Sequence, residues 1–147
     1  MNDTMSRYDS LLYIDAGAMS HRDGFHIGVR RLMGIFQTGK RAKIRKRLEI
    51  GSRLELVRER DNKYDAFAVR VDDALIGNVG YIERAFNKDI AFVMDSGAPC
   101  YAVVSYVDND TATPGVLLDI YCSAERERLI EIRELYKEHL LKMSLNN

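Results

Sequence analysis

The sequence predicts a mainly β fold of the α+β class, in which a small, partly open barrel carries one short inserted helix and a C-terminal helix. Short stretches typical of β-strands recur between residues 25 and 82 and again between 101 and 122. Between residues 86 and 94 the apolar positions change once to the spacing of a helix. Short strands of this kind avoid exposed edges by closing into a barrel.

The length of 147 residues, with 46% hydrophobic and 30% charged residues, indicates one folded domain. We expect an N-terminal extension at 1–24, the barrel at 25–122 and a helix packed on the same domain at 123–147. The sequence has neither a long apolar run nor a secretory signal pattern. We therefore expect a cytoplasmic protein with no membrane partner.

The first predicted strand runs from Phe25 to Leu32, with Gly28 as a candidate bulge. Further strands are predicted at 53–56, 67–71 and 75–82, with turns at 61–63 and 72–73. Close spacing of these short strands is typical of a meander. A hairpin is predicted from 101–107 and 116–122, which are rich in β-branched and aromatic residues.

The inserted helix is predicted from four apolar residues on one face: Phe86, Ile90, Val93 and Met94. The terminal helix is expected to begin with Ser123 as its N-cap and to run to about Lys142. Its apolar stripe consists of Leu129, Ile132, Tyr136, Leu140 and Met143. One interpretation is that this helix only covers the barrel. The alternative is that it also forms a homodimer, because Ile130 and Leu141 lie off the stripe and would otherwise be exposed.

The charge of the chain is unevenly distributed, although its formal net charge is zero. From Lys40 to Arg60 there are nine basic and three acidic residues, whereas Asp61 to Cys122 contains four basic and ten acidic residues. Six basic residues fall within eight positions: Lys40, Arg41, Lys43, Arg45, Lys46 and Arg47. Such a run is either a solvated surface or a phosphate-binding one, and we expect it to bind DNA phosphates.

No motif for catalysis, a metal or a cofactor is found. Cys100 and Cys122 lie in apolar runs, where buried thiols are favoured over a disulfide. The three histidines, His21, His26 and His139, lack metal-ligand spacing. We therefore expect a protein that is not an enzyme and uses no cofactor.

The stretch from Gly51 to Arg84 reads GSRLELVRERDNKYDAFAVRVDDALIGNVGYIER. Within it, one group of residues follows the order of a known pattern: Gly51, Leu54, Leu56, Arg58, Glu59, Asn62, Tyr64 and Asp65. A second mark is Val79-Gly80-Tyr81-Ile82-Glu83-Arg84, opening a helix. In these features the chain resembles the HIRAN domain family, over roughly Phe25 to Tyr121. The resemblance implies a small OB-like/SH3-like barrel, found in DNA-remodelling helicases and as free-standing bacterial proteins.

The resemblance also implies binding of single-stranded DNA, and in one branch of the family capture of its 3′ end. If the roles of the matching family residues apply to this chain, Tyr64 stacks a base and Asp65 accepts a hydrogen bond from the terminal 3′-hydroxyl. Both have an alternative reading as ordinary turn residues. The remaining implied contacts are Asn62 beside the turn, Arg30 on a phosphate, and Tyr81 and Arg84 at the helix start. Arg31 is expected to contribute as well.

The chain departs from the family pattern in three places, two of which reduce the aromatic surface, while the third makes the turn less rigid and adds a charge. Arg31 and Leu32 stand where the end-binding branch has aromatic residues, Lys63 replaces the turn proline, and the loop from Asp108 to Gly115 has no aromatic. Each base stacked on an aromatic is worth about 1–3 kcal/mol.

Three functions therefore remain open at the level of sequence. The first is single-stranded DNA or 3′-end binding in DNA repair, with a helicase or nuclease partner. The second is a protein-interaction or assembly module that keeps the barrel but has lost its ligand. The third is phosphate-backbone binding without preference for an end.

Overall fold

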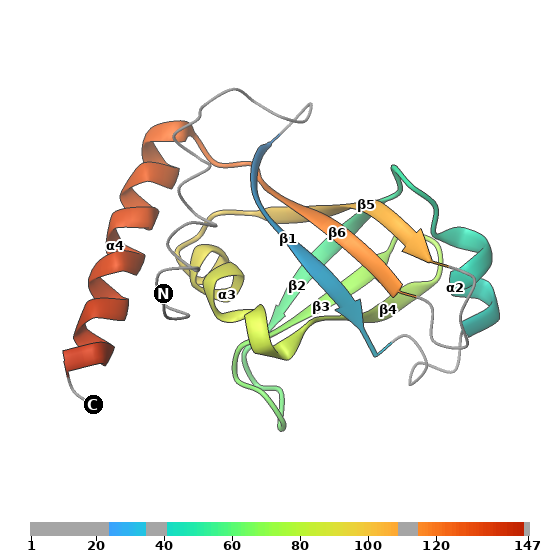
Figure 1. Cartoon of the computed structure of the whole chain (residues 1–147), viewed down its shortest axis with the longest axis horizontal. Coiled ribbons are helices and arrows are strands. Elements are labelled where there is room, and N and C mark those ends of the chain that lie inside the picture. The colour runs from blue at the N-terminus through green and yellow to red at the C-terminus, as the bar shows by residue number, and fades with distance from the viewer. Residues whose placement is uncertain (1–23, 35–40, 109–114, 146–147) are drawn as a thin grey trace.

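The computed structural model of the chain describes residues 24–34, 41–108 and 115–145 (Figure 1). Its strands are β1 (Phe25–Met33), β2 (Arg53–Glu59), β3 (Ala68–Asp73), β4 (Gly77–Ile82), β5 (Cys100–Asp108) and β6 (Gly115–Cys122). Its helices are α2 (Arg41–Arg47), the 3-10 turn η3 (Arg84–Phe86), α3 (Lys88–Asp95) and α4 (Arg126–Leu145). The predicted mainly β fold with an inserted and a terminal helix is confirmed.

The six strands form a closed antiparallel barrel in the order β1-β4-β3-β2-β5-β6. The prediction of a partly open barrel was wrong, because β1 pairs with β6 from Phe25 to Leu32 and then with β4 at its far end. That second pairing depends on Gly80, where φ is +146° and an added Cβ would lie 2.4 Å from the Met33 carbonyl oxygen. Only glycine permits so close an approach of two backbones.

The barrel interior is filled by the alternating apolar residues of its strands. Leu54, Val69, Val71 and Leu118 are almost completely buried. This confirms the two-residue period predicted for these strands, in which every second side chain faces the core. The predicted bulge in β1 is also present, since the pairing with β6 shifts register between His26 and Gly28.

Helices α2 and α3 lie at opposite ends of the barrel (Figure 1). The first buries Ile44, and the second buries Ile90 and Val93. Phe86 was predicted on the buried face of the inserted helix but is 49% exposed. The reason is the break at Asn87 between η3 and α3, which gives Phe86 a different direction from the α-helical face.

The terminal helix α4 packs beside α3, with the rings of Phe92 and Tyr136 5.0 Å apart. Four residues of its predicted stripe are buried, whereas Met143 is exposed. The predicted N-cap was wrong: the helix begins only at Arg126, and the Ser123 N–H, just beyond β6, donates to the Pro99 carbonyl (2.9 Å).

Both cysteines are free and buried, as predicted. Several predicted features lie outside the described residues. They are nearly all of the N-terminal extension, the whole of Lys40, and the interior of the loop between β5 and β6. Among the described helices, none is both long and apolar enough to cross a membrane.

Candidate nucleic-acid interface

An open groove of about 780 Å³ lies between the turn joining β2 to β3 and the segment that begins at η3. Its lining residues are Asn62, Lys63, Tyr64, Asp65, Ala66, Phe67, Arg84, Ala85, Asn87 and Lys88. Two stretches of the chain, 62–67 and 84–88, therefore form its two walls. Four of the predicted site residues, Asn62, Tyr64, Asp65 and Arg84, come together here.

Asn62 shapes the first wall. Its Oδ1 accepts hydrogen bonds from the backbone N–H groups of Tyr64 (2.9 Å) and Asp65 (3.1 Å), while its Nδ2 donates to Glu59 (3.0 Å). An asparagine that bonds the backbone two residues ahead fixes a tight turn in this way. Asn62 consequently acts as the support of the wall, with its polar groups already engaged.

The turn holds two aromatic side chains at the surface. Tyr64 is 83% exposed and Phe67 is 43% exposed. Lys88 of the opposite wall lies over the Phe67 ring, with Nζ 5.4 Å from its centroid. Exposed aromatic faces beside cations are the components with which proteins bind single strands, because every base has a face that can stack.

Asp65 lies deeper in the groove, where its side chain is only 15% exposed. Its Oδ1 accepts from the Phe67 N–H (2.9 Å) and its Oδ2 accepts from Asn87 Nδ2 (2.8 Å). The exposed guanidinium of Arg84 is 3.9 Å from the same Oδ2. Asp65 therefore joins the two walls in addition to presenting a negative charge inside the groove.

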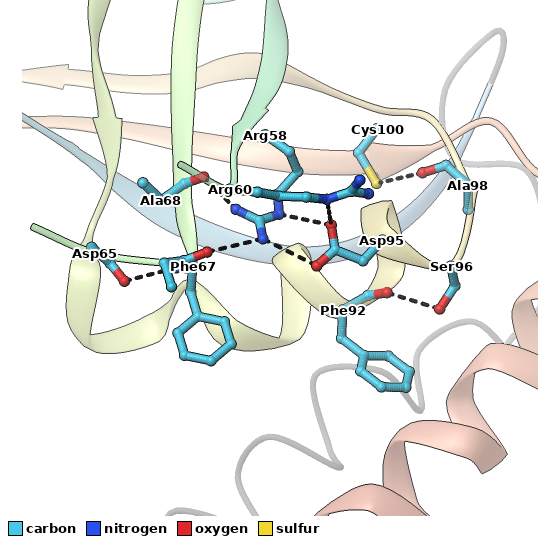
Figure 2. Close-up of polar contacts among 11 residues, drawn as sticks. Arg58, Arg60, Asp65, Phe67, Ala68, Phe92, Asp95, Ser96, Ala98 and Cys100 are labelled. Carbon is cyan, nitrogen blue, oxygen red and sulfur yellow. Dashed lines mark hydrogen bonds and ion pairs between the residues drawn. The ribbon is translucent and has the colours of Figure 1, made fainter. Parts of the chain in front are cut away.

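An arginine whose side chain is mostly covered ties the turn to the far end of α3 (Figure 2). Arg58, 9% exposed, donates to both carboxylate oxygens of Asp95 (2.9 and 3.0 Å). The same guanidinium donates to the carbonyl oxygens of Ala66 (3.0 Å) and Ala68 (2.8 Å). Arg60 donates to Asp95 from a more exposed position (3.0 Å). This Arg58 clamp connects β2, the turn and α3.

The environment of Asp95 favours its charged form. Burial by itself raises the pKa of Asp95, but hydrogen bonds from Arg58 and Arg60, and their positive charges, outweigh burial and hold that pKa below its ordinary value. A carboxylate in the last turn of a helix is otherwise disfavoured by the helix dipole. The two arginines thus make this position acceptable.

Two predicted contact residues are used within the fold. The Arg30 guanidinium donates to the Phe86 carbonyl (2.8 Å) and to the buried carboxylate of Asp89, so it holds β1 against η3 and α3. The Tyr81 hydroxyl donates to Glu59 (2.9 Å), and burial together with that carboxylate raises the pKa of Tyr81. Both side chains support the groove from behind.

Arg31 faces outward at the edge of the same region. It lies opposite Leu117 of β6, which in turn lies opposite Tyr106 of β5. Residues directly opposite in antiparallel strands lie on the same face of a sheet. Arg31 and the exposed Tyr106 therefore share one outer row, and the backbone of Arg31 bonds Glu83, next to Arg84 (Glu83 N to Arg31 O, 3.0 Å).

The basic run lies elsewhere. Its described members are on α2, at the end of β3 that is remote from the groove, where Arg47 donates to the buried Asp73 (3.1 and 3.2 Å). β3 has six residues, so roughly 17 Å of strand separates the two regions. Of Arg41 only the backbone is described. The basic run and the groove are separate surfaces.

Sequence reasoning missed three residues of this region: Phe67, Lys88 and Tyr106. Phe67 was assigned to the first position of a strand, and Tyr106 to an ordinary hairpin strand. Lys88 received no assignment because a single lysine carries no pattern. The sequence did contain one indication that Phe67 belongs to the site: it is an aromatic residue that follows the Asn62 turn and stands where a strand begins.

Among the residues that the structure describes, no group of three or more His, Cys, Asp or Glu side chains could hold a metal ion. The groove offers stacking faces, cations and one carboxylate. Its chemistry is that of a binding site for an anionic, base-bearing ligand.

Comparison with known proteins places the fold. A crystal structure of a protein from Lactobacillus plantarum is similar with 25% identity and a TM-score of 0.61, covering 66% of this chain and 92% of that one. The crystal structure of the HIRAN domain of human HLTF is 18% identical, with a TM-score of 0.51 and coverage of 72% and 84%. An NMR structure of the HLTF HIRAN domain is 20% identical, with a TM-score of 0.51, and the match covers 76% of this chain and 90% of that one.

Comparison with curated proteins finds no match. The family model described as the HIRAN domain matches residues 19–125, which is most of the chain. That range includes all six strands, the groove and the Arg58 clamp. The chain therefore belongs to the HIRAN domain family.

Proposed function

We propose that the chain binds single-stranded DNA in the groove between the β2–β3 turn and the η3–α3 segment. The observation that carries the proposal is the position of Tyr64, whose ring is almost fully exposed at a groove lined by three cations, Lys63, Arg84 and Lys88. Membership of a family of nucleic-acid-binding modules supports it.

In this proposal the two walls have complementary roles. Tyr64 and Phe67 stack bases, while the cations of the groove neutralise the phosphates that follow. The groove combines these three cations with a single carboxylate, although the net charge of the whole chain is zero. Tyr106 and Arg31 extend the stacking and phosphate-binding surface beyond the groove, in place of the aromatics that the first strand lacks.

We further propose a preference for a free 3′ end. Both carboxylate oxygens of Asp65 retain a lone pair beyond the bonds they accept from Phe67 and Asn87. A carboxylate at this depth repels a phosphate but accepts a hydrogen bond from a hydroxyl group. Strands ending in a 3′-hydroxyl would then be bound more tightly than strands ending in a 3′-phosphate.

Fluorescence anisotropy with labelled oligonucleotides of six nucleotides tests both proposals. We expect binding at low salt that weakens as salt rises. Strands with a 3′-phosphate should bind at least fivefold more weakly than those with a 3′-hydroxyl. Absence of binding to any strand at low salt would refute the proposed function, whereas equal binding of both ends would refute only the end preference.

We propose that binding occurs without catalysis, and the same samples test this on a denaturing gel. The oligonucleotide should keep its length after prolonged incubation with magnesium. Shortened products would contradict the proposal. Proteins that create or use DNA ends, such as a helicase or a nuclease, are the partner class that this function implies.

A second candidate function is self-association through α4. This candidate is supported by four apolar side chains that are exposed on that helix: Leu135, Leu141, Met143 and Leu145. Light scattering after size-exclusion chromatography should then give twice the mass of one chain, reduced to one chain by Leu135→Ser with Leu141→Ser. A monomeric mass for the unaltered chain at high concentration would exclude this candidate.

A further inference from the structure

The described part of the basic run forms the outer surface of α2. Ile44 and Leu48 are buried one helical turn apart, which fixes the orientation of the segment. Lys43, Arg45 and Lys46 are exposed around the other sides. Because adjacent residues on a helix differ by about 100°, these three cations cover the whole outward half of α2.

The composition of this surface differs from that of the groove. Helix α2 contains no aromatic and no acidic residue (RAKIRKR). Its fourth described cation, Arg47, is anchored to the buried Asp73, whose pKa lies below its ordinary value. Burial alone raises it, but hydrogen bonds from Leu75, Ile76 and Arg47 and the charge of Arg47 outweigh burial. The outer surface of α2 therefore offers positive charge but no stacking face.

Charge without stacking suits a duplex better than a single strand. Single-strand sites pair cations with aromatics for the unstacked bases, whereas the bases of a duplex already stack on one another. A duplex also carries one negative charge per about 1.7 Å of axis, twice the density of one strand. The three cations from Lys43 to Lys46 lie within about 4.5 Å of helix rise, so their positive charge per unit length is similar to the negative charge per unit length of a duplex.

We propose that the outer surface of α2 is a second site, which binds the phosphate backbone of double-stranded DNA next to the single strand held in the groove. The two sites lie at opposite ends of β3, roughly 17 Å or more apart. The combined ligand is a duplex with a 3′ single-stranded tail. The inference rests on the proposed function for its single-stranded part alone.

The test compares the full chain with a variant carrying Lys43→Gln, Arg45→Gln and Lys46→Gln. A control variant removes the same amount of charge from α4 by Arg126→Gln, Lys137→Gln and Lys142→Gln. Each is titrated by fluorescence anisotropy against a six-nucleotide single strand, a blunt duplex and a duplex with a six-nucleotide 3′ tail. Circular dichroism melting checks that both variants remain folded.

We expect the α2 variant to bind the tailed duplex at least tenfold more weakly, with its salt slope reduced by about 2–3. Its affinity for the single strand should change less than twofold, and the control should change less than twofold on every ligand. Unchanged affinity and slope on the tailed duplex, or an equal loss in the control, would overturn the proposal.

Failure of the proposed function would look different. In that case the unaltered chain would not bind the single strand, while a dependence of blunt-duplex binding on α2 would still support the second site. Binding of the single strand with no contribution of α2 to either duplex would overturn the second site and leave the groove intact.

Discussion

At the scale of single residues, Tyr64 and Asp65 are neighbours with different roles in the structure. Tyr64 is exposed, and the described structure gives its hydroxyl no hydrogen bond. The carboxylate of Asp65 is mostly buried and accepts two hydrogen bonds that hold the groove walls. A substitution at Tyr64 therefore tests the ligand, whereas one at Asp65 tests the ligand and the fold together.

We predict that Tyr64→Ala weakens single-strand binding by about 1–3 kcal/mol, roughly 5- to 150-fold, because one stacking face is lost. The melting temperature should stay within error, since little of the side chain is buried. Anisotropy and thermal melting measure the two effects. Tyr64→Phe should bind nearly as the unaltered chain does, and a loss as large as that of the alanine variant would show that stacking is not the contact.

For Asp65 we predict that alanine lowers the free energy of unfolding by about 1–3 kcal/mol even without DNA. It removes the acceptor of the Phe67 N–H and leaves the buried Nδ2 of Asn87 without its partner. Urea unfolding followed by circular dichroism measures the loss. Unchanged stability would contradict the role of Asp65 in joining the walls.

Asp65→Asn is the sharper probe of the 3′ end. Its Oδ1 can still cap Phe67, and Asn87 can turn its amide so that its Oδ1, unpartnered among the described residues, accepts from the new amide. We expect near-normal stability but a smaller preference for a 3′-hydroxyl over a 3′-phosphate in the anisotropy assay. A full preference in this stable variant would exclude the carboxylate as the end-recognising group.

The resemblance to the HIRAN family was sufficient to predict Asn62, Tyr64, Asp65 and Arg84 as site residues, because each of them matches a position in the short motifs of that family. It was insufficient for Phe67, whose exposure depends on β3 beginning one residue later, at Ala68. Nor did it predict that Arg30 is engaged by Phe86 and Asp89, since those contacts join positions more than fifty residues apart.

At the scale of elements, the Arg58 clamp decides how firmly the turn is held. We predict that Arg58→Gln lowers the free energy of unfolding by about 1.5–3 kcal/mol, because hydrogen bonds to a carboxylate and two carbonyl groups are lost. Single-strand affinity should fall with it, since one wall of the groove loses its support.

Arg60→Gln is the matched control for the clamp. It removes a bond to the same Asp95 carboxylate from a side chain that is mostly exposed, and exposed ion pairs contribute about 0–1 kcal/mol. Equal destabilisation of the two variants in urea unfolding would show that the bonds of Arg58 to the turn contribute nothing.

The pH dependence of stability tests the same element. In the folded chain the pKa of Asp95 is below its ordinary value of 3.8. The charged carboxylate therefore contributes its full stabilisation at a pH well above 3.8, and this stabilisation is lost as the pH falls below that value. Asp95→Asn should therefore be less stable than the unaltered chain at pH 7, with the difference shrinking below about pH 4. A difference that stays constant from pH 7 to pH 3 in urea unfolding would contradict this.

Helix and strand positions were predicted well where a period extended over several residues, as in β2 and β3. Their ends were predicted less well. Ser123 is a good N-cap by type, but its N–H is bonded to Pro99, so α4 starts later. Phe86 fits the helical spacing, yet the break at Asn87 separates it from α3. Such ends depend on contacts between segments that are distant in sequence.

At the scale of the whole molecule, barrel closure places the functional regions. Closure depends on β1 reaching both β6 and β4, which requires the backbone of Gly80 to approach Met33. No local pattern predicts this, because the pairing joins strands far apart in the chain. The same closure puts the basic helix and the groove at opposite ends, and so separates two sets of residues that the sequence suggested as one interface.

The most direct test of the groove as the binding site is an NMR titration of the ¹⁵N-labelled chain with a six-nucleotide single strand bearing a free 3′-hydroxyl. The largest amide shifts are predicted for 62–67 and 84–88, with only small shifts on the exposed surface of α4. Binding accompanied by shifts confined to other surfaces, with these two segments unchanged, would contradict the account.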